Sequence, residues 1–304
     1  MSVPVYGIEQ YFLNQESGLA YDISGFHDGS TMHTHNFYEF FVVTNGTALH
    51  LINDSIQELH EGDFYFIRPS DTHCYNFNHI ADFFTRNLAF TDQIFQNISV
   101  FLHQSDQMHQ LTDSQFPPHI HLEKDSLHTV IRYLEQIGAL INKGSAIHAK
   151  CHAQCILALF FEDYFFSHES NQQADLIPAW LKRLLFDMQK IENFQAGYPR
   201  MCELANYTPN HLNRMMKKYT SKTPTEYINE QRLIYSLYLL SQTDMEILKI
   251  SENCGFSNLS YFYHLFQKQF KKKLSQLLPK RQFLPFLFPS CFFFAKKGTE
   301  GMKT

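Results

Sequence analysis

Four residues in the first quarter of the chain carry side chains that together suit a divalent transition metal: His33, His35, Glu39 and His73. The first three occupy odd positions, so a single β-strand would point all of them to one face, with about 6.6 Å between alternate residues. Imidazole nitrogens and a carboxylate oxygen are ligands for zinc, nickel, iron or manganese. The sequence therefore predicts a site of three nitrogens and one oxygen, although the same groups could hydrogen-bond a polar ligand without a metal.

Between Thr31 and Phe90 the chain contains only two arginines, Arg68 and Arg86. A guanidinium group can bind an anionic ligand group through two parallel hydrogen bonds. The alternative is that each arginine is a partly exposed ion-pair partner. Together with the three histidines and Glu39, they complete the predicted ligand-binding set.

A second group of residues forms a near-repeat with an offset of 49 or 50 positions. The first copy contains Met201-Cys202, Asn206-Tyr207-Thr208, Leu212 and Met216, and the second contains Ile250-Ser251, Gly255-Phe256-Ser257, Phe262 and Phe266. Asn206 and Gly255 tolerate positive φ in a tight turn, while Thr208 and Ser257 can cap the helix that follows. Each copy therefore predicts a helix-turn-helix unit.

The elements that must position the first group are short strands between Thr31 and Phe90, broken by the hairpin-type pairs Asn45-Gly46 and Asn53-Asp54. This pattern favours an antiparallel barrel or sandwich. Residues 124–142 and 147–167 have helical spacing of apolar residues around a turn at Gly144-Ser145. Such a helical hairpin could cover the sheet or pair with a second copy of the chain, which predicts a homodimer.

Charge divides the chain into two unlike parts. Residues 1–175 contain 6 Lys+Arg and 21 Asp+Glu, a net charge of −15, whereas residues 176–304 contain 19 and 9, a net charge of +10. A basic domain has the electrostatic properties of a surface that binds nucleic acid. No basic run followed by an apolar core opens the chain, and no apolar stretch of about 18 residues occurs, which predicts a cytoplasmic protein without a membrane span. The six cysteines form no CxxC pair, and we expect them to be small buried hydrophobes.

The chain resembles the AraC/XylS family of bacterial transcription regulators. Its front half matches the cupin pattern HxHx3Ex6G through His33, His35, Glu39 and Gly46, and it continues with Gly62-Asp63, Pro69 and His73. The glycine that precedes this pattern in cupins is replaced by His27, and Asp71 stands where cupins often carry another glycine. The back half resembles the signature domain of the family through LNRMMKKYTSKTPTEYINEQR (residues 212–232) and ISENCGFSNLSYFYHLFQKQFKK (residues 250–272).

The resemblance implies that helices at 209–219 and 258–270 each enter a major groove and are joined by a long helix at 224–241. The implied base-reading residues are Asn210, His211, Asn213 and Arg214 in the first helix, and Asn258, Ser260, Tyr261 and His264 in the second. The implied phosphate contacts, which position the protein without specifying sequence, are Lys217, Lys218, Lys222, Lys268 and Lys271.

The predicted architecture is a multidomain α and β chain. It comprises a cupin-type antiparallel β-barrel at 1–120, a helical hairpin at 121–170, a linker at 171–177, an all-α domain with two helix-turn-helix units at 178–279, and an atypical hydrophobic tail at 280–304. After Lys273 the tail departs from the family pattern.

The resemblance implies a regulator, not an enzyme, of a carbohydrate operon. Its effector would be a sugar or sugar phosphate of the β-glucoside or chitobiose type. Its macromolecular partners would be double-stranded operator DNA and RNA polymerase. The alternative function is a metal-dependent cupin oxygenase or isomerase, which leaves the basic half unexplained.

Overall fold

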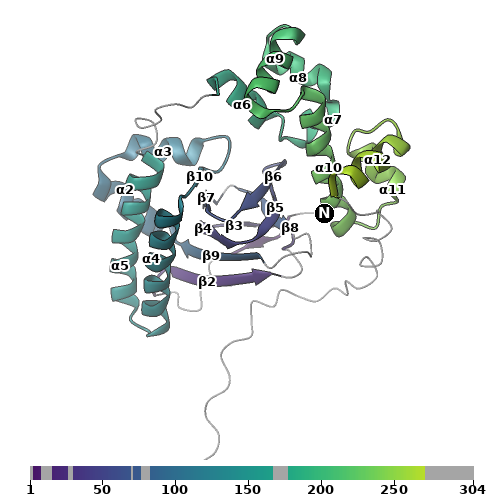
Figure 1. The fold of residues 1–304 in the computed structure, drawn as a ribbon. Helices are drawn as coiled ribbons and strands as arrows, with labels where there is room; N and C mark the ends of the chain where they lie inside the picture. The colour runs from purple at the N-terminus through teal and green to yellow at the C-terminus, as the bar shows by residue number, and fades with distance from the viewer. Residues whose placement is uncertain are drawn as a thin grey trace, which may run out of the picture.

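The computed structural model describes residues 3–7, 16–26, 30–69, 71–76, 83–166 and 177–270. These residues form a β-rich part with helices along one side and an all-helical part that lies above β5, β6 and β8 (Figure 1). Residues 171–176 of the predicted linker, the tail at 280–304, and His27 and Lys271 lie outside the described residues. Within the described ranges, none of the helices combines the length and hydropathy that crossing a bilayer requires.

The strands form two main sheets. Five strands pair in the order β10-β7-β4-β9-β2, three pair in the order β6-β5-β8, and β1 pairs with β3. The two main sheets are antiparallel throughout, as predicted. The strands are β1 Val5–Tyr6, β2 Leu19–Phe26, β3 Thr34–His35, β4 Tyr38–Asn45, β5 Thr47–Ile52, β6 Ser55–His60, β7 Asp63–Ile67, β8 His73–Asn76, β9 Phe83–Phe90 and β10 His119–His121.

The predicted hairpin turn at Asn53-Asp54 is confirmed, because it joins the paired strands β5 and β6. The prediction is wrong for Asn45-Gly46, which joins β4 and β5 as a corner between the two main sheets. Asn53 and Asp54 have φ of 47° and 60°, and Gly46 has φ of 81°. Two successive residues with positive φ are the requirement of a type I′ turn, whose twist matches that of the flanking strands. The turn fixes the register of β5 against β6, so Leu51 lies opposite Ile56.

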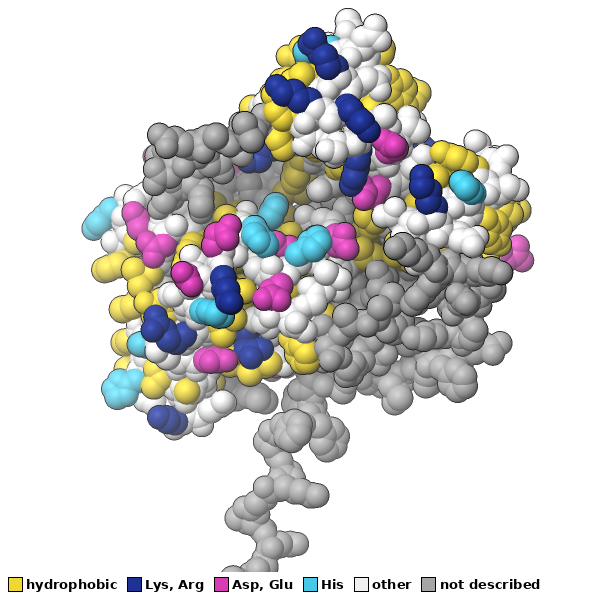
Figure 2. Space-filling model, in the orientation of Figure 1, with side chains coloured by type: hydrophobic (Ala, Val, Ile, Leu, Met, Phe, Trp, Pro, Cys, Tyr) yellow, Lys and Arg dark blue, Asp and Glu magenta, His cyan; other side chains and the backbone are white. Residues whose placement is uncertain are grey.

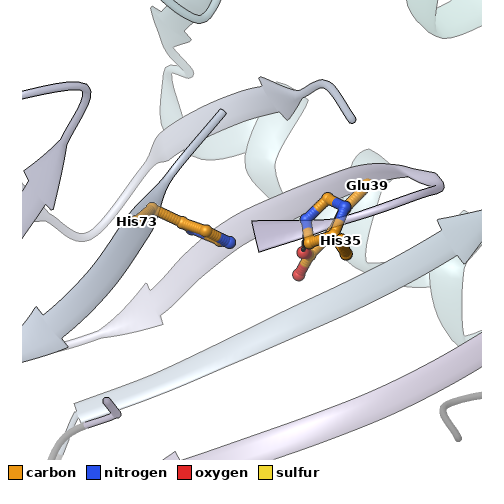
Figure 3. A group of neighbouring side chains, drawn as sticks. All are labelled: His35, Glu39 and His73. Atoms are coloured by element: carbon orange, nitrogen blue, oxygen red, sulfur yellow. Dashed lines mark ion pairs between the residues drawn. The ribbon is translucent and has the colours of Figure 1, made fainter. Parts of the chain in front are cut away.

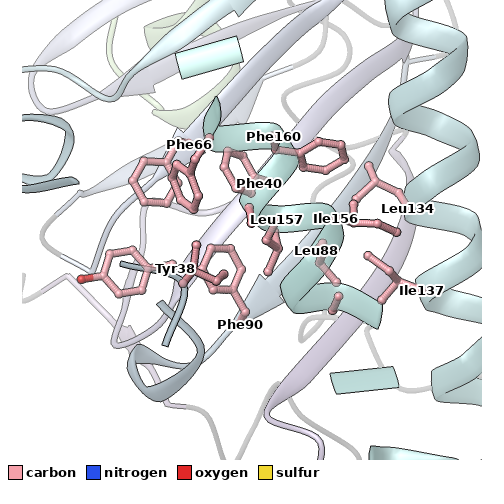
Figure 4. Close-up of a cluster of buried hydrophobic side chains, with 14 of the residues drawn as sticks. Tyr38, Phe40, Phe66, Leu88, Phe90, Leu134, Ile137, Ile156, Leu157 and Phe160 are labelled. Atoms are coloured by element: carbon pink, nitrogen blue, oxygen red, sulfur yellow. The ribbon is translucent and has the colours of Figure 1, made fainter. Parts of the chain in front are cut away.

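Alternation along the strands creates two apolar regions on opposite faces of the five-stranded sheet. Phe40 and Val42 face the helices and belong to the same apolar cluster as Phe64. Phe40 also packs with Phe66 and Phe90 (Figure 4). Phe41 and Val43 point the other way, into the space between the two sheets, which we call the barrel interior. Its other apolar residues are Ala48, Ile52, Leu59, Tyr65, Ile67, Tyr75 and Phe83.

The helices of the β-rich part cover the outer face of the five-stranded sheet (Figure 1). They are α2 Asp92–Leu102, α3 Ser105–Asp113, α4 Lys124–Asn142 and α5 Ala146–Phe160, followed by the π-helical turn η1 Phe161–Phe166. The predicted hairpin is therefore present as α4 and α5, with Gly144 at φ of 72° in the turn. The sequence pattern did not indicate α2 and α3.

The expected burial of all cysteines is wrong for α5. Cys74 and Cys254 are buried and Cys202 is partly buried, but Cys151 and Cys155 are exposed. They lie on the face of α5 opposite Ala149 and Ala153, which pack into the core. Cys291 lies outside the described residues.

The helical part contains both predicted helix-turn-helix units, α8–α9 and α11–α12, joined by α10. Its helices are α6 Ala179–Asp187, α7 Ile191–Ala196, α8 Tyr198–Ala205, α9 Pro209–Thr220, α10 Pro224–Gln242, α11 Ile247–Asn253 and α12 Leu259–Phe270. Asn206 and Gly255 have φ of 51° and 89°, as the turn prediction required. A Cβ atom at position 255 would lie 2.6 Å from the Gln195 carbonyl oxygen, so only glycine fits there.

One predicted helix cap is correct and one is displaced by a residue. The Thr208 hydroxyl accepts a hydrogen bond from the His211 amide, as predicted. In the second unit the Asn258 side chain accepts from the Tyr261 amide at 2.9 Å, so Asn258 takes the place that the sequence assigned to Ser257.

Candidate ligand site and nucleic-acid interface

Three of the four predicted metal ligands meet in the barrel interior. One ligand atom from each of His35, Glu39 and His73 lies within 4.8 Å of the other two, and all three residues are buried (Figure 3). His35 comes from β3, Glu39 from β4 and His73 from β8. His35 Nε2 lies 3.4 Å from Glu39 Oε2.

A bend, not a continuous strand, brings His35 and Glu39 together. The prediction that one strand carries His33, His35 and Glu39 is wrong, because the chain bends at Asn36 and Phe37 between β3 and β4. His35 Nδ1 lies 2.7 Å from the Phe37 carbonyl oxygen. A carbonyl can only accept, so Nδ1 donates this hydrogen bond and Nε2 is the ring nitrogen directed at Glu39.

The fourth predicted ligand, His33, lies beside this group but not within it. Its ring centroid is 4.4 Å from that of His73 and 6.3 Å from that of His35. A β-bridge to His73 places it there, with backbone hydrogen bonds of 3.0 and 2.8 Å. His33 Nδ1 donates to the Thr31 carbonyl at 2.8 Å.

Burial disfavours the charged form of three imidazoles in or beside the interior, those of His33, His50 and His73. It lowers the pKa of His50 to about 3 and that of His73 well below its usual range, and it also lowers the pKa of His33. Neutral imidazoles offer lone pairs to a metal or to a hydroxyl donor. Both ring nitrogens of His73 and Nε2 of His35 are buried without a hydrogen-bond partner, as ligand atoms awaiting a bound group would be.

The two predicted arginines do not point into the interior. Arg68 is buried and pairs bidentately with Asp71 at 2.8 and 2.9 Å, and its remaining amine bonds the Ser114 carbonyl at 2.6 Å. Arg86 lies on the helix-facing side of β9, since it pairs in register with Val42, and its guanidinium is 3.5 Å from Glu135 of α4. Their guanidinium groups therefore have internal partners in place of an anionic ligand.

Sequence reasoning missed three polar residues of the interior. His50 alternates with the interior residues Ala48 and Ile52, while Thr85 and Asn87 lie opposite Val43 and Phe41 in the ladder and so share their face. His50 Nε2, Thr85 Oγ1 and Asn87 Oδ1 are all buried without a hydrogen-bond partner. Strand alternation could have identified them, because residues at alternate positions of a strand face the same side of the sheet.

The predicted DNA-contacting residues lie mostly on the exposed faces of α9 and α12. Asn210, Asn213, Arg214, Lys217, Lys218, Asn258, Ser260, Tyr261, His264 and Lys268 are exposed, and His211 and Lys222 are half-buried. Figure 2 shows several Lys and Arg side chains on the helical part, while acidic side chains are more frequent on the visible face of the β-rich part. Residues 177–270 hold 11 Lys+Arg and 8 Asp+Glu, a net charge of +3, so most of the positive charge counted in the sequence lies outside the described residues.

Some of these side chains have structural partners. The Asn213 amide donates to the Pro209 carbonyl at 2.8 Å, and Asn258 caps α12. The Tyr261 hydroxyl accepts from Asn229, and Lys222 pairs with Glu230. Among the predicted base readers, the side chains of Asn210, Arg214, Ser260 and His264 are exposed and take no part in these contacts, so they best suit contacts to bases.

An aromatic group supports the first recognition helix and was not predicted. Trp180 of α6 packs on Tyr207 with ring centroids 4.4 Å apart, and Tyr207 stacks on His211 at 4.9 Å. Arg214 Nη2 lies 3.3 Å from His211 Nδ1. The stack therefore restrains the His211 ring, which in turn contacts Arg214.

Replacing Arg214 with Ala should weaken binding to operator DNA by about 1–3 kcal/mol and relax the preference at one base position, if Arg214 binds a base bidentately. Competition binding with operator variants measures this effect. Lys218→Ala on the same helix is the matched control, and it should weaken binding to operator and random duplexes alike. An equal loss on both duplexes for Arg214→Ala would assign it to the phosphate backbone.

Comparison with known proteins gives matches in both parts of the chain. Residues 21–136 match the AraC-like ligand binding domain and residues 201–279 match a helix-turn-helix domain. The HTH-type transcriptional activator RhaS of Salmonella schwarzengrund (strain CVM19633) is 25% identical over 246 residues, covering 78% of this chain and 84% of its own length. RhaS of Escherichia fergusonii is 25% identical over 248 residues with the same coverage.

Solved structures with some likeness include ToxT from Vibrio cholerae O395, with 13% identity, a TM-score of 0.36, and coverage of 88% of this chain and 99% of that chain. The C-terminal domain of AraT from Geobacillus stearothermophilus has 21% identity, a TM-score of 0.33, and coverage of 38% and 97%. The two domain matches together span more than half of the chain, and the matched relatives are transcription regulators rather than enzymes. A ligand-binding barrel precedes a domain with two helix-turn-helix units, and the chain belongs to the AraC family of transcription regulators.

Proposed function

We propose that this ligand-responsive, DNA-binding regulator senses a neutral carbohydrate in its barrel interior and controls an operon for carbohydrate use. The observation that carries the proposal is the set of buried polar atoms without partners on His50, Thr85 and Asn87. Sugar hydroxyls can donate to and accept from such groups, and pockets for small molecules combine a few polar groups with aromatic walls. Tyr65 and Phe41 supply such a wall, stacked with ring centroids 4.9 Å apart.

Charge favours a neutral sugar over a sugar phosphate. Glu39 lies in the interior, and the guanidinium groups of Arg68 and Arg86 are paired elsewhere. Among the described residues of the interior, therefore, there is no lysine or arginine to neutralise the negative charge of a phosphate. Transfer of an anion into such surroundings without a partner is unfavourable.

A thermal-shift and calorimetric series tests the effector class with chitobiose, cellobiose, D-xylose, L-rhamnose and glucose 6-phosphate. We expect one of the neutral sugars to raise the melting temperature, and Asn87→Ala to weaken its binding about tenfold, equal to about 1.4 kcal/mol. Asn97→Ala, an exposed asparagine of α2, should leave binding unchanged. Tighter binding of the phosphate, or no binding by any of the sugars, would contradict a neutral carbohydrate effector.

A divalent transition metal at His35, Glu39 and His73 is the second part of the proposal. The donor set of two imidazoles and one carboxylate fits zinc, nickel, iron or manganese, with His33 close enough to join after a rotation of its side chain. A bound metal would supply a Lewis-acidic position for a sugar hydroxyl. The protein's own contribution is to hold His35 through the Phe37 carbonyl.

Elemental analysis of untagged protein checks the metal. We expect about one metal per chain, lost in His73→Ala and retained in His60→Ala, since His60 is an exposed histidine of β6. Less than about a tenth of a metal per chain, after dialysis against each candidate ion, would exclude metal binding at this site.

We further propose that the regulator forms a homodimer through α5 and contacts RNA polymerase from its DNA-bound position. Ile147 and Leu159 support the dimer, since 78% and 44% of their surfaces are exposed on the outer side of α5. Light scattering of the purified chain measures the assembly, and transcription with purified polymerase measures activation or repression.

A further inference from the structure

The long helix α10 joins the two helix-turn-helix units and carries an arginine whose side chain contacts elements on both sides of it. Arg232 lies near the middle of α10 and is half-buried. Its guanidinium reaches the last turn of α7 and also the turn between α11 and α12. The helix α7 packs with the first unit, because Phe194 lies in the same apolar cluster as Leu212 and Met216. One side chain therefore touches structure that belongs to each unit.

Two hydrogen bonds hold this guanidinium against α7. Arg232 Nε donates to the Phe194 carbonyl and Arg232 Nη2 donates to the Gln195 carbonyl, each at 2.8 Å. These carbonyls lie in the last turn of a helix, where partners within the helix run out and a cation interacts favourably with the helix dipole. Because a guanidinium is planar and presents its donors in a fixed fork, the two bonds together define its orientation.

The same guanidinium contacts the turn of the second unit. Arg232 Cζ lies 5.6 Å from the centroid of the Phe256 ring, within the range of a cation–π contact. The Gln195 side chain also donates to the Asn253 carbonyl at the end of α11. The end of α7 and the turn of the second unit are thus connected directly and through Arg232.

Two glycines, one on each side, leave the space that Arg232 occupies. A Cβ atom at Gly197, between α7 and α8, would lie 2.7 Å from Arg232 Nη2, and one at Gly255 would lie 3.0 Å from Arg232 Nε. Non-bonded heavy atoms prefer separations of about 3.5–4.0 Å, so a side chain at either position would displace the guanidinium. Both backbones therefore approach the arginine more closely than any other residue type would allow.

We propose that Arg232 is a positioning residue for DNA binding, which holds the two helix-turn-helix units in one relative orientation and so sets the spacing of the DNA segments that α9 and α12 contact. Successive major-groove sites on one face of a duplex lie about 34–36 Å apart, one helical turn. Units in a fixed orientation match one such spacing, whereas units that turn about α10 match several but must be ordered on binding. The inference rests on α9 and α12 both contacting DNA, and it is independent of the effector proposed above.

Duplexes that differ only in spacing test this role. A bound sequence is selected with the full-length chain from duplexes with a random core of about 30 base pairs, and footprinting locates its two contacted halves. Two base pairs are then inserted between the halves, which moves one half by about 7 Å and rotates it by about 70° around the duplex axis. We call the ratio of the dissociation constants for the inserted and original duplexes the spacing penalty.

We expect a spacing penalty of at least about tenfold for the wild-type chain, because one recognition helix loses its base contacts. Arg232→Met keeps an unbranched side chain but removes the donors and the charge, and its penalty should be less than about threefold. Arg232→Lys keeps the charge without the planar fork, so its penalty should lie between these values. A penalty equal to that of the wild-type chain in either variant would overturn the positioning role.

The matched control is Arg200→Met, because the Arg200 guanidinium bonds Asn193 and Glu203 and does not bridge to the second unit in these bonds. We expect it to keep the wild-type spacing penalty. An arginine that only stabilised the fold would change the affinity for both duplexes by the same factor and leave the penalty unchanged, so the ratio separates positioning from folding. If Arg232→Met does not fold in a calorimetric scan, the Arg232→Lys penalty decides. A wild-type chain without any penalty would show instead that α9 and α12 do not bind one duplex together, which would remove the premise.

Discussion

Replacing Asp71 with Ala should lower the free energy of unfolding by about 3–5 kcal/mol, because it leaves the buried Arg68 guanidinium without its carboxylate. The side chains of Arg68 and Asp71 are 4% and 1% exposed, and their closest contact is 2.8 Å. Asp71 also accepts from the Arg68 amide and from Asn53, so the substitution removes partners from three groups at once. Urea denaturation followed by circular dichroism measures the change.

The matched control for Asp71 is Glu252→Ala, which breaks an ion pair to Lys249 whose side chains are 64% and 50% exposed. We expect a much smaller loss there, since solvent screens an exposed pair. A loss below about 1 kcal/mol for Asp71→Ala would show that the Arg68–Asp71 pair contributes little to folding.

Replacing Phe262 with Ala should destabilise the second helix-turn-helix unit by about 3–5 kcal/mol, since a fully buried phenylalanine leaves a large cavity. Phe262 contacts Phe256 and Phe266, with ring centroids 5.2 and 5.7 Å away, and so joins the turn to α12. DNA binding should fall with it, because α12 would no longer be held in a fixed orientation. Calorimetric melting and gel-shift titration measure both effects.

Tyr263→Ala is the control for Phe262, because its side chain is the next along α12 and is 43% exposed. We expect a change in stability within about 0.5 kcal/mol. Similar stability and DNA affinity for Phe262→Ala and Tyr263→Ala would mean that the second unit does not depend on this core for DNA binding.

The sequence by itself determined the local structure and the order of the two parts. The helix-turn-helix units were predictable because turn, cap and apolar spacing are all local, as Asn206, Thr208 and Gly255 illustrate. The strands between Thr31 and Phe90 were predictable for the same reason, from apolar alternation between turns such as Asn53-Asp54, whereas β2 and β10 were not predicted. The division of charge identified the basic part, since net charge needs no coordinates.

Only the tertiary structure decided which side chains share an environment. Arg68 donates a hydrogen bond to the Ser114 carbonyl and Arg86 pairs with Glu135. More than 40 residues of sequence separate the partners in each case, so local spacing could not predict these contacts. Strand parity states that His50 and Leu51 face opposite ways, but not which of them meets the ligand site and which meets the helical part. That choice depends on how the two sheets and the helices pack, because burial is a property of the whole fold and alternation is a property of a single strand.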